Sequence, residues 1–319
     1  MTTLLSPPTA TATRASPRTG GPNLGVRERL APYAYVAPFF LLFAIFGLFP
    51  LLFTFYVALF DWNPIGAHTF VGFDNFSQLF SDPRFWGALR NTLSIWVIST
   101  VPQLLLALGV AHLLNHARLR AATFLRMSVL VPYITSVAAT TVVFAQLFDR
   151  DYGALNWLIG LLGFDHVDFT ASVLGSHIMI ATMVIWRWSG FNTLLYLAAL
   201  QALPQDVYEA AAVDGAGAWR QFRHITIPSL RPIIVFTVVT STIGGLQIFT
   251  EPLLVNPTAS LTCGAARQCQ TMTLFLYEQG FGRFRFGYGA AIGVALFVMV
   301  VIAATTNYLL AARIRSERP

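Results

Sequence analysis

The sequence predicts an all-α membrane protein with six transmembrane helices, and three observations support this fold class. The 319 residues are 55% hydrophobic and only 11% charged, with a mean hydropathy of +0.63, whereas soluble domains carry about 25% charged residues. Apolar segments recur that reach the roughly 20 residues a helix needs to cross the hydrocarbon core of a bilayer. The arginines are enriched in alternate loops, which is typical of a multi-pass membrane protein.

Six apolar segments are long enough to span a bilayer. They comprise residues 33–60, 92–114, 124–148, 174–203, 229–250 and 287–312. Several contain Pro or Gly, which membrane helices tolerate. Residues 1–26 are rich in Thr, Ser, Pro and Ala and are predicted to form a disordered tail. Residues 27–319 then form a single transmembrane domain, in which residues 61–91 are expected to pack one or two short amphipathic helices onto the membrane surface.

All 20 basic residues are arginine, and their positions predict the orientation of the chain. Thirteen lie within residues 14–29, 118–126, 220–231 and 313–318, and six lie in the loops of the opposite side. The arginine-rich side is cytoplasmic by the positive-inside rule. Both termini and residues 205–228 are therefore expected inside the cell, in a multi-pass protein of the plasma membrane. The absence of lysine excludes a P-loop lysine, so the chain cannot itself be a Walker-type ATPase.

The polar stretch between the fourth and fifth apolar segments has the composition of a helix–glycine–helix hairpin. Pro204 suits a helix start, and residues 209–213 are good helix formers. Gly215 and Gly217 permit a break, and Pro228 restarts the chain into the membrane. The alternative interpretation is an ordinary cytoplasmic loop.

The motif in this hairpin resembles the EAA loop of the permeases of ATP-binding-cassette (ABC) importers. It consists of Glu-Ala-Ala at 209–211, Asp-Gly-Ala at 214–216 and Ile-x-Ile-Pro at 225–228, with Ile227 where the family usually has Leu. The resemblance implies the type I importer permease fold, and it implies that residues 205–228 couple this chain to an ATPase. The expected coupling residues are Glu209, Ala210, Ala211, Asp214, Gly215 and Ala216.

Most of the chain, from residue 33 to 312, is similar to the carbohydrate-uptake permeases of ABC importers, the group that contains the maltose permease subunits. The similar stretches include Ala37-Pro38, Phe49-Pro50, residues 71–76, residues 131–133 and residues 200–204. Residues 241–247 and 281–288 carry a narrower similarity, to actinobacterial permeases for cellobiose and related oligosaccharides.

This resemblance implies a transport subunit that is not an enzyme, within an ATP-driven importer of a di- or oligosaccharide. The implied partners are a second permease, an ABC ATPase dimer, an extracellular solute-binding lipoprotein, the sugar and the lipid bilayer, with no nucleic acid. We expect this chain to bind no cofactor and no metal of its own.

Polar residues at membrane depth are candidates for the transport path, because ionisable groups there are costly. Arg187 lies in the fourth segment and Glu251 near the outer end of the fifth, where they either form a structural ion pair or line a polar cavity. Similarity to the larger maltose permease subunit implies sugar contacts at further positions. The candidate path residues are Tyr133, Trp186, Gly190, Asn192, Gln247 and Glu251. These residue types suit a sugar, because aromatic faces stack on sugar rings and amides bind their hydroxyls. The alternative interpretation of the tryptophans is that they belong to the aromatic belt at the membrane interface.

The state of the two cysteines and the class of transporter each allow more than one interpretation. Cys263 and Cys269 lie in the last external loop, where they form either a disulfide or two free thiols. An importer of another solute, such as glycerol phosphate, is the alternative within the same class of protein. A secondary transporter, which uses a coupling-ion site, is the alternative outside the class. Dependence of uptake on an ATPase would distinguish an ABC importer from a secondary transporter.

Overall fold

The structure is a computed structural model that describes residues 26–64, 66, 68–116, 122–255 and 261–316. The predicted tail, residues 1–26, lies outside the described residues except for Val26. The chain divides into two units, Met1–Leu52 and Phe53–Pro319.

The described part of the first unit is helical and strongly apolar. α1 (Val26–Phe43) continues through a π-helical turn, η1 (Ala44–Leu48), into α2 (Phe49–Val57), whose last residues belong to the second unit. The stretch Tyr33–Val57 contains 25 residues and is apolar enough to span a membrane. It corresponds to the first predicted segment, 33–60.

The second unit is almost entirely helical, which confirms the all-α fold class. Its elements are β1 (Phe60–Trp62), β2 (His68–Phe70), α3 (Asp74–Ser81), α4 (Pro83–His116), α5 (Ala122–Ile134), α6 (Val137–Leu147), α7 (Ala154–Leu161), α8 (Val173–Gln201), α9 (Gln205–Val213), α10 (Ala218–Gln221), the π-helical η2 (Phe222–Thr226), α11 (Ile227–Leu246), α12 (Thr250–Leu254), α13 (Met272–Tyr277), the π-helical η3 (Glu278–Gly282) and α14 (Phe286–Ser316). The two short strands form an antiparallel hairpin with Phe60 opposite Phe70.

Four helices of the described chain are long and apolar enough to cross a membrane. They are Tyr33–Val57, Pro83–Asn115, Ala218–Leu254 and Phe286–Leu310. A fifth span results if the bent pair α5 and α6 is taken as one. Length and composition therefore support four or five spans in the described residues, and the predicted count of six is not confirmed.

The third predicted segment, 124–148, is not one straight helix, because its two halves meet at an angle of 93°. Pro132, inside α5, has no N–H to donate, and its ring crowds the preceding turn. Ser136 then takes an extended backbone conformation, with ψ 130°, so the helical ladder ends before α6 begins. Such a break is tolerated at membrane depth where other protein segments cover it.

The fourth predicted segment, 174–203, is helical as α8 but does not qualify as a span by composition. It carries the buried polar side chains of Ser176, His177 and Asn192 as well as the guanidinium of Arg187. These groups are tolerated because they have polar partners within the protein: Ser94 of α4 for His177, Ser241 of α11 for Asn192 and Glu251 of α12 for Arg187. A helix surrounded by protein needs less apolar surface than one that faces lipid.

The most extensive helix packing in the unit joins α4 to α8. Ala107 and Ala111 of α4 are fully buried in one cluster with Tyr196 of α8. Small residues let two membrane helices approach closely. α5 also approaches α8 closely at Gly190, where an added Cβ would collide with the carbonyl oxygen of Val129. The middle of α8 is therefore held from two sides.

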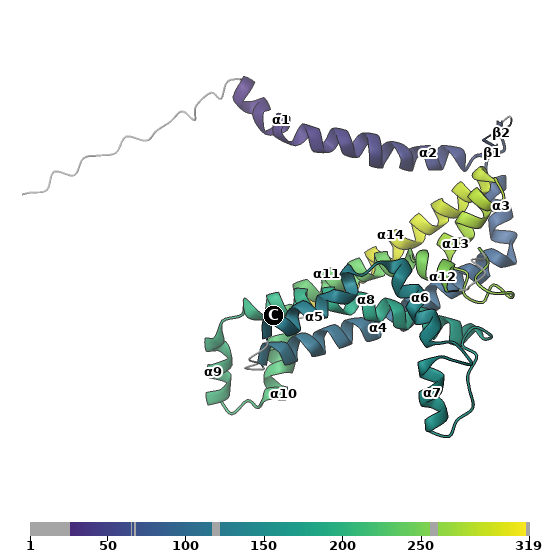
Figure 1. Ribbon diagram of the computed structural model, residues 1–319. Helices are drawn as coiled ribbons and strands as arrows, with labels where there is room; N and C mark the ends of the chain where they lie inside the picture. Colours follow the sequence, from purple (N-terminus) through teal and green to yellow (C-terminus); the bar gives the residue numbers. More distant parts are fainter. Residues whose placement is uncertain (1–25, 65, 67, 117–121, 256–260, 317–319) are drawn as a thin grey trace, which may run out of the picture. The chain divides into compact units, whose positions relative to one another are not determined.

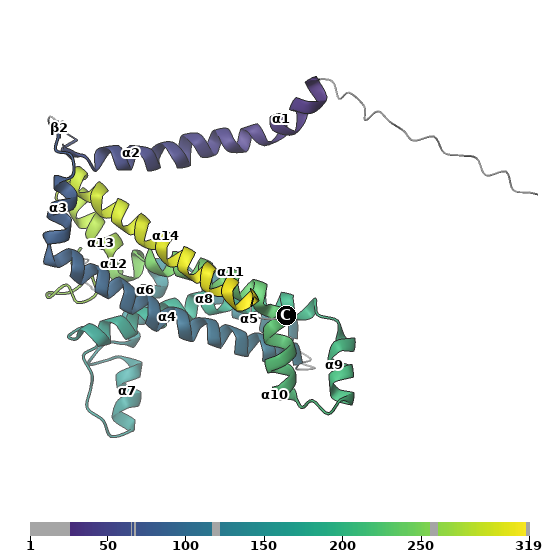
Figure 2. The same ribbon diagram turned by 180° about the vertical axis from the view of Figure 1, so that it is seen from behind.

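Opposite ends of the second unit carry different structures (Figures 1 and 2). One end carries the helical hairpin of α9 and α10 and is called the hairpin end. The other end carries the β-hairpin, α3, α13 and the start of α14, and it is called the network end after the polar network around Glu278. α3 is a short helix of the kind expected within residues 61–91, and α4 begins at Pro83, earlier than the predicted residue 92. Asn75 of α3 donates to the carbonyl oxygens of Ala58 and Phe60 at 2.9 Å each, which fixes α3 beside β1.

Candidate functional site: coupling hairpin and transport path

The hairpin between α8 and α11 turns at a glycine. α9 ends in a Schellman motif, in which the N–H of Ala216 donates to the carbonyl of Ala211 at 2.9 Å and the N–H of Gly215 donates to that of Ala212 at 3.0 Å. Gly215 has a φ of +76°, a conformation that costs little only for glycine. The predicted helix–glycine–helix structure is confirmed, with its bend at Gly215.

Side chains hold the hairpin in one geometry and attach it to the helix bundle. Tyr208 Oη lies 3.0 Å from Thr226 Oγ1, and Gln221 Nε2 donates to the carbonyl oxygen of Tyr208 at 3.4 Å. The ring of Phe222 meets that of His112, on α4, with centroids 4.6 Å apart. The hairpin therefore contacts α4 and is joined in sequence to α8 and α11.

Glu209 and Asp214, the acidic residues of the predicted coupling motif, are exposed. Neither side chain has a hydrogen bond or ion pair within the described residues. Glu209 borders a cleft of about 560 Å³ between α9 and the adjoining ends of α4 and α8. The cleft is lined by Asn115, Leu200, Gln201, Leu203, Gln205, Tyr208, Glu209 and Gln221. An unpaired carboxylate beside an open cleft can accept a basic side chain of another protein.

A polar cluster lies deep in the unit where α4, α8 and α11 meet. Ser241 Oγ accepts hydrogen bonds from Gln103 Nε2 at 3.3 Å and from Asn192 Nδ2 at 3.4 Å, and all three residues are buried. Gln103 and Ser241 also line a small pocket with Thr100 and Trp188. The cluster contains amide and hydroxyl groups of the kinds that bind sugar hydroxyls. In this conformation they are closed against one another, and Asn192 joins α8 to α11.

Tyr133 and Trp186, two predicted path residues, belong to different aromatic groups. Tyr133 stacks on Phe191 with ring centroids 4.9 Å apart and meets Trp188 edge-on at 5.7 Å. Trp186 is 38% exposed, and its ring packs against Phe144 of α6 at 5.5 Å. Trp188, which is not among the candidate path residues, is thus the tryptophan that connects Tyr133 to the pocket beside the polar cluster.

The other predicted path residues lie in different surroundings. Gly190 is buried at the crossing of α5 and α8, where the absence of a side chain is a packing requirement. Gln247 follows the last turn of α11, is exposed, and makes no side-chain hydrogen bond within the described residues. Of the two, only Gln247 has unused capacity to bind a solute. Their assignment to the path stays a prediction.

Arg187 and Glu251 form a buried ion pair between α8 and α12. Arg187 Nη1 lies 3.1 Å from Glu251 Oε1, and the two side chains are 13% and 6% exposed. The structure thus contains the structural ion pair that the sequence left as one of two alternatives. Arg187 Nε is buried and has no partner in the described chain. A guanidinium with five donors that forms one such bond leaves the pair incompletely satisfied.

Comparison with known proteins identifies the family. The family model of the binding-protein-dependent transport system inner membrane component matches residues 82–316. The chain belongs to this family. The permease is therefore a multi-pass membrane protein, and its match includes the hairpin, α8 and α11.

Individual relatives confirm the resemblance to carbohydrate-importer permeases. The permease is 34% identical over 274 residues to the lactose transport system permease protein LacF of Rhizobium radiobacter, which covers 85% of this chain and 90% of LacF. It is 30% identical over 304 residues to the arabinooligosaccharides transport system permease protein AraP of Bacillus subtilis, covering 95% of each chain. Both relatives are transport permeases, and this chain is likewise a transport subunit and not an enzyme.

A solved structure supports the fold independently. A chain in the crystal structure of a bacterial alginate ABC transporter, in complex with an alginate pentasaccharide-bound periplasmic protein, matches with a TM-score of 0.78. The match covers 91% of the permease and 98% of that chain at 22% identity. This likeness shows that the permease has the fold of an ABC transporter subunit.

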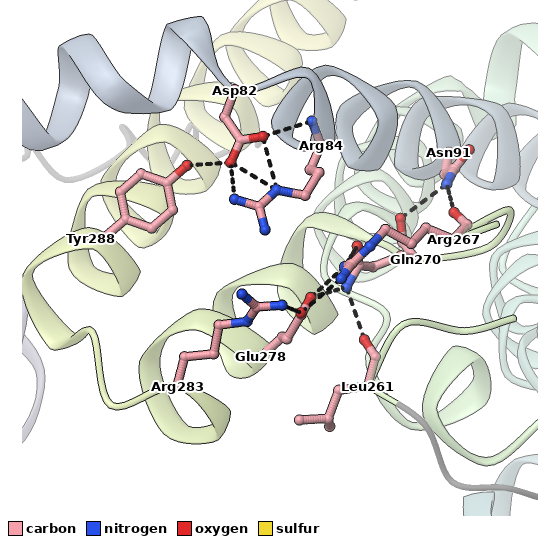
Figure 3. A network of polar contacts seen from close by, with 9 residues as sticks. All are labelled: Asp82, Arg84, Asn91, Leu261, Arg267, Gln270, Glu278, Arg283 and Tyr288. Carbon is pink, nitrogen blue, oxygen red and sulfur yellow. Dashed lines mark hydrogen bonds and ion pairs between the residues drawn. The ribbon is translucent and has the colours of Figure 1, made fainter. Parts of the chain in front are cut away.

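At its network end the permease has a polar network around Glu278 that sequence reasoning missed (Figure 3). Glu278 accepts hydrogen bonds from Arg267 at 2.9 Å, Arg283 at 3.0 Å and Gln270 at 2.7 Å, and it is 4% exposed. Burial raises the pKa of the Glu278 carboxyl, but the hydrogen bonds from Arg267 and Gln270 outweigh it and hold the pKa below its ordinary value of 4.5. The carboxylate is therefore the ionised centre of the network.

The same network attaches the last loop to α4. Cys263 and Cys269 form a disulfide, which is one of the two states that the sequence left open. Asn91 Nδ2 donates to the carbonyl oxygens of Arg267 at 3.0 Å and Gln270 at 3.1 Å, as Figure 3 shows. The only sequence signal for this site is the presence of three arginines and one glutamate within residues 255–286.

Two further contacts close the network end. Asp82 pairs with Arg84 and accepts a hydrogen bond from Tyr288 Oη at 2.9 Å, which joins the start of α4 to α14 (Figure 3). His177 Nε2 of α8 lies 2.9 Å from the carbonyl oxygen of Gln268 in the disulfide loop. The last loop is thus held by both α4 and α8.

Proposed function

We propose that this permease is one of two membrane subunits of an ATP-driven importer for a di- or oligosaccharide, and that residues 205–228 bind its ATPase. The observation that carries the proposal is the hairpin. Internal hydrogen bonds hold it in one geometry, while Glu209 and Asp214 remain exposed and unpaired within the described residues. The sugar class is supported by relatives that are named for lactose and arabinooligosaccharides and align over most of the chain.

The orientation of the importer follows from the arginines. Thirteen lie in the set of alternate segments of the sequence that includes the hairpin, so the hairpin end and both termini face the cytoplasm, where ATP is available. The network end faces outward, where an extracellular solute-binding lipoprotein delivers the sugar. An ATPase dimer below and a second permease alongside complete the assembly.

The path of the sugar passes the region where α8 and α11 meet. These helices flank the hairpin, so movement of a docked ATPase displaces them relative to each other. The bonds that Ser241 accepts from Gln103 and Asn192 are long, at 3.3 and 3.4 Å, and all three groups suit sugar hydroxyls. In the inward- or outward-open state, these groups exchange their mutual bonds for bonds to the solute. The ligand thereby favours one of two states of the bundle.

The test is uptake by the complete importer, assembled with its second permease, ATPase and binding protein. We expect ATP-dependent uptake of a labelled oligosaccharide, and we expect Glu209→Lys to abolish most of it because the reversed charge repels a basic side chain of the ATPase. Asp206→Lys, on the same exposed helix but outside the motif, is the matched control and should transport nearly normally.

Each competing function predicts a different result in the same assay. Normal uptake by the Glu209→Lys importer would refute coupling through this motif. Uptake that persists without the ATPase and follows an ion gradient would identify a secondary transporter. ATP-dependent uptake of glycerol phosphate but of no sugar would show that the importer carries another solute, while coupling to the ATPase would still hold.

A further inference from the structure

The loop between α6 and α8 contains an apolar tip that the transport path and the coupling hairpin do not explain. Residues 154–164, which include α7, contain no charged side chain, whereas residues 149–151 before them and Asp165 and Asp168 after them are charged. The large apolar side chains of the tip are strongly exposed. They are Trp157 at 63%, Leu158 at 50%, Leu161 at 65%, Leu162 at 75% and Phe164 at 69%.

The polar side chain within this tip is fully used inside the loop. Asn156 is completely buried, and its Nδ2 donates to the carbonyl oxygens of Asp149 at 3.0 Å and Val167 at 2.9 Å. Its Oδ1 accepts the N–H of Val167 at 2.9 Å. Asn156 thereby joins the two limbs of the loop, so the tip keeps its shape without an apolar core of its own.

The backbone at the end of α7 is also satisfied. Gly163, with a φ of +82°, closes the helix in a Schellman motif. The N–H of Phe164 donates to the carbonyl of Ile159 at 3.2 Å, and the N–H of Gly163 donates to that of Gly160 at 3.0 Å. Internal pairing of backbone groups is the condition for placing a segment in a lipid environment, because an unpaired group there costs several kcal/mol.

The position of the loop brings the tip to the membrane. Its two ends continue directly into α6 and α8, and Figure 1 shows α7 running across the direction of α4 and α8 rather than along it. A helix that crosses the direction of the spanning helices at their end lies in the plane of the membrane surface. The tip is therefore held beside the adjoining ends of α6 and α8.

We propose that residues 154–164 insert into the outer leaflet of the membrane, so that the permease has an interfacial anchor besides its spanning helices. The exposed tryptophan and phenylalanine suit the boundary between headgroups and acyl chains. The charged residues at both ends of the tip remain at headgroup level. Apart from the indole N–H of Trp157, residues 154–164 expose no polar side chain, whereas a docking surface for a soluble partner mixes apolar and hydrogen-bonding side chains, so lipid is the occupant. The outer placement rests on the orientation in the proposed function, and the solute plays no part in it.

The test is fluorescence quenching at two positions of the full chain. Leu161→Cys places a label in the tip, and Asp165→Cys places the same label just beyond it. The native cysteines are joined to each other and do not react with a maleimide. Each labelled protein is reconstituted in phosphatidylethanolamine and phosphatidylglycerol vesicles, with or without lipids brominated along their acyl chains. We expect brominated lipid to remove most of the emission at residue 161 and iodide in the buffer to remove most of it at residue 165.

The remaining outcomes overturn the proposal. Quenching of the residue 161 label by iodide would show that the tip is in water. Protection of that label from both quenchers would show that protein covers the tip, either the second permease or another copy of this chain. Labelling of Asp165→Cys by an impermeant maleimide only after intact cells are opened would place the loop on the inside. That last result would also refute the orientation of the importer, whereas failure of the bromine test alone leaves the proposed function intact.

Discussion

At the hairpin end of the permease, Glu209 and Asp214 are exposed and have no side-chain partner in the described chain. At the network end, in contrast, Glu278 is 4% exposed and accepts hydrogen bonds from three side chains. The hairpin turns at a single glycine with positive φ. The last loop of the network end is closed by a disulfide and attached to α4 through Asn91.

This difference indicates that the network end contributes mainly to stability and the hairpin end mainly to binding a partner. Polar groups that are satisfied internally contribute to the folded state and have little left for a partner. Polar groups left exposed contribute little to folding but can bind another protein. Changes at the hairpin end should therefore alter transport at nearly constant stability. Changes at the network end should alter stability first and transport only when the outer loops loosen.

The largest expected effect is that of Gly215→Pro. Proline fixes φ near about −65° and cannot adopt the +76° of this residue, and it removes the N–H that bonds to Ala212. We expect uptake to be abolished while the amount of permease in the membrane stays close to normal. Gly217→Ala is the matched control, because Gly217 has a φ of −66° and an added Cβ meets no atom within 4 Å. Normal uptake by the Gly215→Pro importer would mean that the bend is dispensable.

The second effect should be one of stability, from Glu278→Gln. The neutral amide leaves Arg267 without its charged partner, and breaking a buried ion pair typically costs about 3 kcal/mol or more. We expect a clearly lower unfolding temperature of the purified permease, with uptake retained at low temperature. Arg283→Gln removes a partner whose side chain is 49% exposed and should change the unfolding temperature much less. Equal effects of the two variants would contradict the central position of Glu278.

Acid should loosen the network end in the same way. The pKa of Glu278 is lower in the folded protein than its ordinary value of 4.5. Its contribution to stability is therefore fully present above that value and is lost as the pH falls through the lower folded pKa. The difference in unfolding temperature between wild type and Glu278→Gln should shrink over this acidic range. A constant difference would assign the stabilisation to packing instead of charge.

The hairpin could be predicted from the sequence because its signals are local. Pro204 before α9 and Gly215 after it mark the boundaries, and both act through the backbone of their own neighbours. The family was predictable for the same reason, since the motif is a short run with fixed spacing. In contrast, Asn91 bonds to the carbonyl of Arg267 across 176 positions. No periodicity of the chain indicates which distant loop a buried amide meets.

The membrane-depth residues lie between these extremes. Arg187 and Glu251 are recognisable in the sequence because a charge at that depth needs a partner, and the structure pairs them across 64 positions. Of the cluster around Ser241, the sequence predicted only Asn192, because serine and glutamine in an apolar helix carry no charge to draw attention. The break after Pro132 was missed because proline is tolerated in membrane helices, and its consequence depends on the packing of α6.

A smaller effect is expected from removal of the disulfide, with Cys263→Ser and Cys269→Ser together. A crosslink that closes so short a loop stabilises by about 2 kcal/mol through the unfolded chain. Asn91 and His177 still hold the loop to α4 and α8, so we expect a modest fall in unfolding temperature and unchanged uptake. Loss of uptake at a temperature where the variant remains folded would show that this loop has a role in transport.

The smallest expected effect on uptake comes from the predicted transport path, which lies apart from the hairpin and network ends. Gln247 is exposed, so losing one hydrogen bond from it to a sugar should cost about 1 kcal/mol, which is about a five-fold loss of apparent affinity. We expect a loss of this size for Gln247→Ala in uptake assays, and a similar loss for Trp186→Ala if its exposed face stacks on the sugar.

Tyr152→Ala is the control for removal of an exposed aromatic ring, because Tyr152 is 94% exposed and lies outside the predicted path. If only Gln247→Ala reduces uptake, Trp186 would be assigned a packing role against Phe144. Trp188, which lines the small pocket, would then be the candidate for stacking on the sugar. Unchanged uptake in both variants would mean that the second permease holds the sugar. The permease described here would then supply coupling at its hairpin end and a fixed frame at its network end, which is the division that the exposed Glu209 and the buried Glu278 already indicate.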